Sequence, residues 1–294
     1  MAPHLVTRRR MFSILAGCTA VPAVAAPVQS WQGKAMGADA QILLAQQPKT
    51  AGYALFKKVE HIIAQVEQSF SLHVDSELAR LNATGLLRHP SQAMINLIAL
   101  SARVHDATNG VFDPTIQPLW LALAKGQNPN AVRDRIGWCR LSVEEVGVRL
   151  ARESKLTFNG IAQGFCADQV AALLRGEGFD KVLVNMGEIS ALGQNSDASG
   201  WPVSIADRDG HTLRTIPLVN RALATSSPFS LRLAGGEPHI LGPHGEMPRW
   251  QTVSVSDTSA AVADALSTAF CLMDRPAIDQ ALLHFPDARI EVLA

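Results

Sequence analysis

The stretch VADALSTAFCLM, residues 262–273, is rich in alanine, contains neither glycine nor proline, and repeats apolar side chains at helical spacing. It therefore predicts an apolar helix in the last part of the chain. Asp264 and Thr268 are four residues apart in this stretch, so their oxygen atoms would lie on one face of the helix. An otherwise apolar helix would thus direct a carboxylate and a hydroxyl toward the same point.

Two interpretations of this pair are open. In the first, Asp264 favours the helix dipole from the first turn, and Thr268 bonds to its own backbone. In the second, the pair binds a hard cation such as Mg²⁺, which prefers oxygen ligands and is usually held by one or two carboxylates, water and substrate phosphates. The second interpretation requires a phosphate site elsewhere in the chain.

A candidate phosphate site occurs in LTFNGIAQGFCADQV, residues 156–170. The pattern predicts a strand that ends at Phe158, a glycine-containing turn over residues 159–164, and a helix directly after it. Such a turn presents free backbone N–H groups and the positive end of a helix dipole, which suits phosphate. It matches neither GxGxxG nor a P-loop, because no Lys-Ser or Lys-Thr pair follows. An ordinary glycine turn is the alternative interpretation.

Composition and charge exclude several classes of protein. The chain has 294 residues, of which 47% are hydrophobic and 18% charged, so it can bury a substantial core and is not disordered. The formal net charge is zero and the body of the chain has no basic stripe, which argues against nucleic-acid binding. No apolar run in the body is long enough to span a bilayer.

The order of elements predicts an α+β fold. Helical spacing dominates the first half, short strand-like runs follow from residue 182, and helices return after residue 260. We expect one compact domain over residues 27–294, with antiparallel sheets packed against helices. Finer expectations are a glycine turn at Met36-Gly37 that breaks the first strand, a non-helical segment at 111–120 because of its two prolines, and a strand at 229–234. A hairpin is also expected over 139–158, with strands at 146–151 and 155–159 that turn at 152–154.

The first 26 residues form a separate unit, because a basic region, an apolar stretch and the small-residue sequence AVA before Ala26 are typical of an export signal. Arg9 and Arg10 favour the twin-Arg form, which exports folded proteins to the periplasm; a signal for the general route is the alternative. The sequence LAGC at residues 15–18 resembles a lipoprotein box, but we favour cleavage near residues 25–26 over a lipid anchor at Cys18. The three remaining cysteines show no CxxC pair and are expected to be buried thiols.

Several stretches, taken in order, match one family over nearly the whole mature chain. The sequence resembles the ApbE family of flavin transferases (FAD:protein FMN transferases). The matching stretches are MGADAQI from residue 36, DSELARLN from 75, NGVFDPTIQPLW from 109, NGIAQGFCAD from 159, VLVNMGEISALG from 182, LATSSP from 223, HILGP from 239 and ADALSTAF from 263.

The resemblance implies Mg²⁺-dependent transfer of FMN from FAD to a Thr or Ser hydroxyl of a target protein, with release of AMP. It also implies an acceptor with an S/T-G-A-T-like segment, such as a membrane electron-transfer subunit. Asp264 and Thr268 match the family's metal ligands, and the position of Gly160 matches a backbone carbonyl ligand. The glycine turn lets the backbone approach the phosphates.

Further roles follow by position from the same resemblance. His239 matches the histidine of the motif H-I-x-D-P and is expected to accept a proton from the acceptor hydroxyl; a purely structural histidine is the alternative. Positions expected to contact the cofactor are Met36, Asp113, Thr115, Gln163, Thr225 and Ile240.

Some positions depart from the family pattern. Gln163 stands where Lys or Glu is frequent, and Gly242 replaces the Asp of the histidine motif. Leu72 falls where a Tyr often stacks on the flavin, Thr157 where an Asp is frequent, and Glu188 where a double-glycine Asp motif is usual. We expect the metal chemistry to survive and the flavin to be held differently. The alternatives to a transferase are an FAD pyrophosphatase and a non-catalytic flavin-binding protein.

Overall fold

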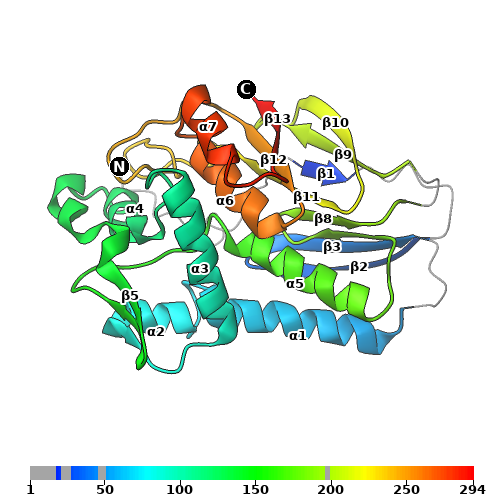
Figure 1. Cartoon of the computed structure of the whole chain (residues 1–294), viewed down its shortest axis with the longest axis horizontal. Coiled ribbons are helices and arrows are strands. Elements are labelled where there is room, and N and C mark those ends of the chain that lie inside the picture. Colours follow the sequence, from blue (N-terminus) through cyan, green and yellow to red (C-terminus); the bar gives the residue numbers. More distant parts are fainter. Residues whose placement is uncertain (1–17, 21–27, 46–50, 196–198) are drawn as a thin grey trace, which may run out of the picture.

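A seven-stranded antiparallel sheet lies at the centre of the molecule (Figure 1). The structure is a computed structural model that describes residues 18–20, 28–45, 51–195 and 199–294. The strand order is β13-β12-β11-β8-β7-β3-β2. In chain order the strands are β2 (Val28–Ala35), β3 (Ala38–Ala45), β7 (Val182–Asn185), β8 (Ile189–Leu192), β11 (Arg221–Ser226), β12 (Val253–Asp257) and β13 (Arg289–Leu293).

Seven α-helices lie in the described residues, and two of them cover one face of this sheet. α5 (Ala162–Gly176) and α6 (Ala260–Phe270) pack on the strands and on each other, and α1 (Tyr53–Phe70) packs against α5. The others are α2 (Glu77–Thr84), α3 (Gln92–Ala107), α4 (Gln117–Ala124) and α7 (Arg275–Leu282). Sheets packed on helices in one compact unit confirm the expected α+β class.

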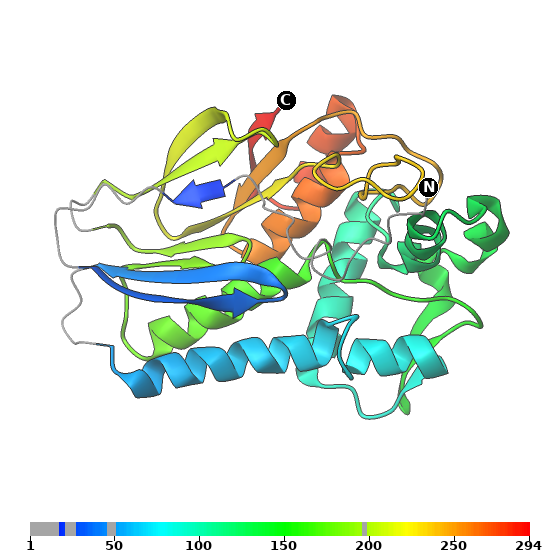
Figure 2. The ribbon, with the colours of Figure 1, turned by 180° about the vertical axis from the view of Figure 1, so that it is seen from behind.

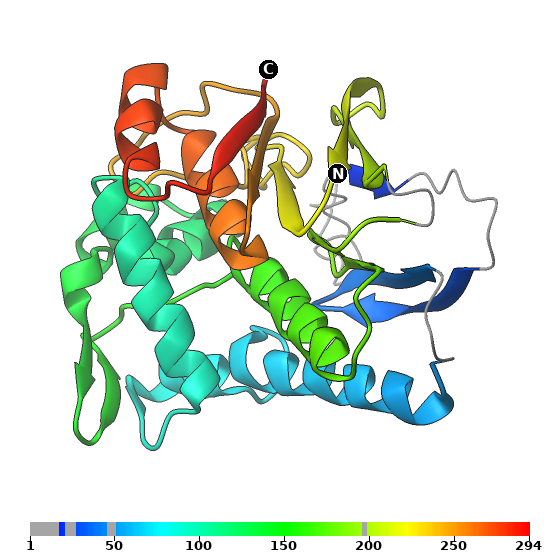
Figure 3. The ribbon, with the colours of Figure 1, turned by 45° about the vertical axis from the view of Figure 1, so that its right-hand side comes forward.

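The second face of the sheet is covered by a small sheet of β1 (Cys18–Ala20), β9 (Trp201–Ala206) and β10 (Thr212–Leu218) (Figure 3). Alternation along the central strands explains the two layers. Val182 and Val184 belong to the core beneath the helices, whereas Leu183 packs with Trp201 and Val203. Because both faces are buried, the central strands carry apolar side chains on both sides of the sheet.

A third sheet of β4 (Leu86–Leu87), β6 (Gly147–Leu150) and β5 (Leu141–Glu144) lies beside α2. It corrects the hairpin expected over 139–158: β6 pairs with the preceding β5, and residues 155–158 form no strand. The predicted strand at 229–234 is also wrong, since only an isolated bridge joins Arg232 to Pro238. Three 3₁₀-helices connect this region: η1 (Pro114–Ile116), η2 (Pro129–Arg135) and η3 (Trp138–Arg140).

The prolines at 114 and 118 begin helices instead of preventing them, which corrects the expectation for residues 111–120. Pro114 is the first residue of η1, and Pro118 lies in the first turn of α4. The N–H groups of a first turn have no partner within the helix, so proline costs nothing there and its fixed φ favours the helical start.

The hairpin between β2 and β3 turns at Met36-Gly37, as expected. Both turn residues have positive φ, 50° for Met36 and 83° for Gly37, and Ala35 pairs directly with Ala38. This is the twist of a type I′ turn, which suits the right-handed twist of the two strands. Met36 adopts a conformation that is uncommon for residues other than glycine, so something must hold it there.

The starts of α5 and α6 are fixed by each other. Asp168 on α5 accepts hydrogen bonds from the Ser259 hydroxyl (2.7 Å) and from the N–H groups of Ala260 (2.8 Å) and Ala261 (3.0 Å) at the start of α6. Asp264 on α6 accepts one from the N–H of Gly164 (3.0 Å) in the first turn of α5. Each helix therefore supplies the carboxylate that caps the other, where the positive dipole ends favour negative charge.

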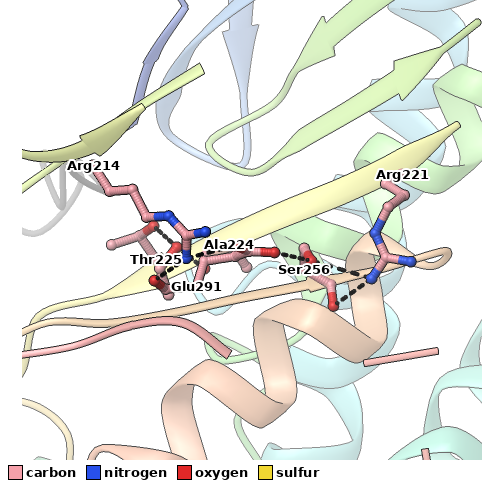
Figure 4. A network of polar contacts seen from close by, with 7 residues as sticks. Arg214, Arg221, Ala224, Thr225, Ser256 and Glu291 are labelled. Atoms are coloured by element: carbon pink, nitrogen blue, oxygen red, sulfur yellow. Dashed lines mark hydrogen bonds and ion pairs between the residues drawn. The ribbon is translucent and has the colours of Figure 1, made fainter. Parts of the chain in front are cut away.

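A polar network joins the strands at the opposite side of the sheet (Figure 4). Arg221 donates to the carbonyl and hydroxyl of Ser256, and the Ser256 hydroxyl donates to Glu291. Glu291 also forms an ion pair with Arg214, at 3.0 Å. The network fixes β10, β12 and β13 relative to the start of β11.

Three sequence expectations concern the termini and cysteines. Within the predicted signal, residues 1–17 and 21–26 lie outside the described residues, while Cys18–Ala20 pair with β9. Cys166 and Cys271 are buried thiols, as expected, but Cys139 is exposed. Among the helices of the described residues, none combines the length and apolar character that crossing a bilayer requires.

The close contact of α5 and α6 generates a stability prediction. A Cβ atom at Gly164 would lie 2.2 Å from the carbonyl oxygen of Ala260. Because that neighbour is backbone, Gly164→Ala should lower the free energy of unfolding by about 1–3 kcal/mol. Gly176→Ala is the matched control at the other end of α5, where an added Cβ meets nothing within 4 Å. Chemical denaturation measures both, and equal stability of the two variants would contradict the packing argument.

Candidate active site

A cavity of about 360 Å³ opens beside the starts of α5 and α6. Its walls come from the β2–β3 turn, the end of α1, residues 111–116, the glycine turn at 159–160, the end of β11, α6 and the loop at 227–241. Nine of the ten residues singled out from the sequence line it: Met36, Asp113, Gly160, Gln163, Thr225, His239, Ile240, Asp264 and Thr268. Segments distant in the sequence thus bring these side chains to one space.

Asp264 and Thr268 lie in this cavity with Gly160. A Cβ atom at Gly160 would lie only 3.0 Å from the Thr268 Oγ1, so the absence of a side chain there permits the approach. Burial raises the pKa of Asp264 to about 7, a shift that the Gly164 N–H opposes and the charge of Asp168 reinforces. A carboxylate, a hydroxyl and a carbonyl are the oxygen donors that Mg²⁺ prefers, and a bound cation would offset the cost of the buried charge.

A cation in this cavity would not be held by His, Cys, Asp and Glu side chains alone. No group of three or more His, Cys, Asp or Glu side chains in the described residues is placed to hold a metal ion. A cation here would therefore take hydroxyl, carbonyl, water or phosphate oxygens beside the carboxylate, as is usual for Mg²⁺.

The glycine turn uses part of its backbone donors within the fold. The N–H groups of Ile161 and Ala162 donate to the carbonyl of Phe158, and that of Gly164 donates to Asp264. These three donors are not free to hold a phosphate. The turn also supplies close backbone approach at Gly160 and the positive end of the α5 dipole.

Glu188 is a second buried carboxylate in the cavity, known from the sequence only as a departure from the family pattern. Its Oε2 accepts a hydrogen bond from the N–H of Thr225 at 3.2 Å. Burial raises the pKa of Glu188, and the nearby carboxylate of Asp264 raises it further. Two carboxylates that disfavour each other's charge in one cavity increase its attraction for a cation.

Glu67 was not singled out from the sequence. Its Oε1 accepts a hydrogen bond from the N–H of Met36 at 3.0 Å, so it holds the turn in its positive-φ conformation, and it lines the cavity. The sequence shows only a Glu on an amphipathic helix, 31 positions away from its partner. No local pattern could have revealed that contact.

Asp113 and Thr115 have different roles. Oδ1 of Asp113 accepts hydrogen bonds from the N–H (2.8 Å) and the hydroxyl (2.7 Å) of Thr115. The Thr115 hydroxyl also accepts one from the N–H of Gly137, and Thr115 is fully buried without lining the cavity. Asp113 therefore faces the site, and Thr115 positions Asp113 from behind.

His239 is held in one orientation by the loop that carries it. Its Nδ1 lies 2.9 Å from the carbonyl oxygen of Pro228 and 3.3 Å from that of Leu231. A carbonyl oxygen can only accept, so Nδ1 carries the proton and Nε2 keeps its lone pair. Burial lowers the pKa of His239, while these two carbonyls oppose the shift. The ring is thus a neutral base with one nitrogen available.

The remaining positions are placed as follows. The Thr225 hydroxyl forms a hydrogen bond with that of Ser254, at 2.8 Å. The backbone N–H of Thr225 donates to Glu188, so the side chain of Thr225 joins two strands while its backbone orients the carboxylate. Gln163 packs closely on Gly187, where an added Cβ would lie 2.4 Å from its Nε2. Leu72 and Thr157 line the cavity, whereas Gly242 is not among the residues that line it.

Comparison with known proteins identifies the family of this chain. A model of the ApbE family matches residues 36–293, and the chain belongs to that family. A FAD:protein FMN transferase of Klebsiella pneumoniae (strain 342) is 24% identical over 88% of this chain and 83% of its own length. The solved flavin transferase ApbE from Vibrio cholerae is 25% identical with a TM-score of 0.75, covering 87% of this chain and 91% of that one. The apo form of the flavinyl transferase ApbE of Pseudomonas stutzeri is also 25% identical, with a TM-score of 0.75 over 89% of each chain.

The environment of His239 generates a prediction on protonation. The imidazole should titrate below its ordinary value of 6.5 and should carry its proton on Nδ1 when neutral. Because the folded-state pKa is depressed, this group favours folding above pH 6.5, and that contribution is lost as the pH falls. Nitrogen-15 NMR of the imidazole over a pH series measures both, with His239→Asn used for assignment. A midpoint above 6.5, or a proton on Nε2, would contradict the assigned geometry.

Proposed function

We propose that this chain transfers FMN from FAD to a Thr or Ser hydroxyl of an acceptor protein, with Mg²⁺, forming a phosphoester and releasing AMP. The observation that carries the proposal is the meeting of Asp264, Thr268 and Gly160 with His239 in one cavity. Oxygen donors for a hard cation beside a neutral base are what transfer of a phosphoryl-linked group to a hydroxyl requires. The names of the relatives support a flavin nucleotide as the group transferred.

Each side of the cavity has a distinct task in this reaction. Nε2 of His239 accepts the proton of the acceptor hydroxyl, while the bond from Nδ1 to the Pro228 carbonyl keeps the ring oriented. A bound Mg²⁺ would neutralise charge on the pyrophosphate as AMP leaves. Asp264 and Thr268 would hold that ion, and the apolar wall formed by Met36, Leu72 and Ile240 suits the flavin ring.

The proposed location is the periplasm, and the proposed acceptor is a membrane electron-transfer subunit with an S/T-G-A-T-like segment. The motif at Arg9-Arg10 supports export of the folded protein, and it lies outside the described residues. Changing both arginines to lysine should retain the protein in the cytoplasm, because a twin-Arg signal needs both guanidinium groups. Cell fractionation of a tagged copy measures this, and normal export of the double variant would remove the twin-Arg assignment.

One assay separates the three candidate functions. The protein is incubated with FAD, Mg²⁺ and an acceptor domain that carries the S/T-G-A-T-like segment, and the products are separated on a denaturing gel. Fluorescent acceptor is the expected result. AMP with free FMN would instead indicate a pyrophosphatase, and bound but intact FAD a flavin-binding protein.

In the same assay His239→Ala should slow transfer by about two to four orders of magnitude, the usual contribution of a general base. FAD binding should persist, because the imidazole acts on the acceptor hydroxyl. An unchanged rate would show that His239 only holds the loop.

A second prediction concerns the metal. Asp264→Asn should raise the Mg²⁺ concentration for half-maximal AMP release by more than about tenfold, since an amide lacks the carboxylate charge. Excess Mg²⁺ should restore part of the rate. Asp168→Asn is the matched control: it loses acceptor capacity at the start of α6 and should lower stability, but it should leave the Mg²⁺ midpoint unchanged. If Asp264→Asn titrates like the unaltered protein, the metal lies elsewhere.

A further inference from the structure

The strand β2 forms an open edge of the central sheet. It is the last strand in the sheet order, and its register with β3 is continuous from Val28 to Ala35. Natural proteins usually protect such edges with prolines, bulges or a covering element. β2 contains neither a proline nor a bulge, and lysine occurs in it once, at Lys34.

The direction of the edge groups follows from the hydrogen-bond pattern. The N–H of Ala45 donates to the carbonyl of Lys181 on the far side of β3, so Ala45 and its partner Val28 form a pair without mutual hydrogen bonds. In an antiparallel ladder such pairs alternate. The N–H and C=O groups of Ser30, Gln32 and Lys34 therefore point away from β3, and no hydrogen bond to them occurs within the described residues. Their side chains are exposed.

A groove runs along this edge, between β2 and α1. It has a volume of about 280 Å³ and is lined by Trp31, Gln32, Gly33 and Lys34 on the strand and by Glu60, Ile63, Ala64 and Glu67 on the helix. The indole of Trp31 lies over Gly33, where an added Cβ would be 2.5 Å from the ring. The groove is thus lined by both apolar and polar side chains beside these backbone groups.

Both walls of the groove lead into the larger cavity. β2 ends at the turn of Met36, and α1 ends at Phe70, and both residues line the larger cavity. Glu67 lines both spaces and bonds the N–H of Met36 between them. Figure 2 shows β2 and α1 running side by side toward the same end of the molecule. A chain in the groove would therefore reach the catalytic cavity directly.

We propose that an extended segment of the acceptor protein adds as a strand to the edge of β2, in the groove between β2 and α1, and so delivers its hydroxyl residue into the cavity past Met36. This inference rests on the proposed function, which supplies the acceptor. Strand addition to an edge beside a helix gives affinity through backbone hydrogen bonds. At about 3.3 Å per residue, some six to eight residues of acceptor would follow β2.

The test removes one edge donor without touching the hairpin. In Gln32→Pro the outward N–H is lost, while the bonds between β2 and β3 are kept because they use the alternate residues. Gln32→Ala is the matched control with the N–H retained. The expected result is an acceptor KM raised about tenfold or more in Gln32→Pro only. FAD binding should be equal in both variants, which shows that the fold and the cavity are intact.

A second measurement leaves the enzyme unaltered. Synthetic acceptor peptides are N-methylated at alternate residues before the hydroxyl residue, in two sets that differ by one position. In an added strand only alternate residues donate their N–H groups to β2, so N-methylation blocks those bonds in one set and leaves them intact in the other. The first set should lose about tenfold in transfer rate, and the second should not. Equal rates for the two sets, or an unchanged KM for Gln32→Pro, would overturn the proposal. So would a dimer of this chain that Gln32→Pro dissociates without changing transfer, because β2 would then pair with a second copy.

Failure of the proposed function is recognised separately. If the unaltered protein leaves every acceptor without flavin, the transferase assignment fails before the edge is tested. If the unaltered protein does flavinylate the acceptor, the Gln32 variants and the methylated peptides test only whether the acceptor binds along β2.

Discussion

The reciprocal capping of α5 and α6 is the constraint on which the rest of the molecule depends. Asp168 on α5 fixes the first residues of α6, and Asp264 on α6 fixes Gly164 at the start of α5. The two helices can meet this closely only because position 164 has no side chain. They cover one face of the central sheet, so the same contact orients the glycine turn, the end of β11 and the core beneath them.

The two aspartates differ in how many hydrogen bonds their carboxylate oxygens already accept within the fold. Asp168 uses both of its oxygens on three donors at the start of α6, so it is committed to the fold. Asp264 gives one oxygen to Gly164 and faces the cavity with Thr268 and Glu188. Burial raises the pKa of all three carboxyl groups, those of Asp168, Asp264 and Glu188. A bound cation would offset the cost of these buried acids.

The sequence predicted the features that depend on neighbouring residues. Apolar spacing located the helix observed as α6, and the pair Met36-Gly37 located the first turn. Helix geometry alone placed Asp264 and Thr268 on one face. An error arose where local chemistry has two outcomes, because Pro114 and Pro118 could end helices or begin them.

Other features could not be predicted from the sequence, because they are contacts between segments that are far apart in it. Glu67 meets Met36 through the packing of α1 beside β2, and Thr115 reaches Gly137 rather than the cavity. The resemblance to the family assigned Thr115 to the cofactor together with Asp113, and only the structure separates the two. Strand order is a similar case, since periodicity identifies a strand but not its partner.

The order of strands in the sheet also governs how the chain can acquire its shape during synthesis. β3 spans residues 38–45, yet its second neighbour is β7 at 182–185, and α6, which fills the space beneath the sheet, begins only at residue 260. The first hairpin leaves the ribosome long before β7 and α6 exist, and only α1 follows it closely. Contacts this far apart in sequence close slowly. The β3 edge of this hairpin therefore lacks its native partner for an interval in which association with other chains competes with folding.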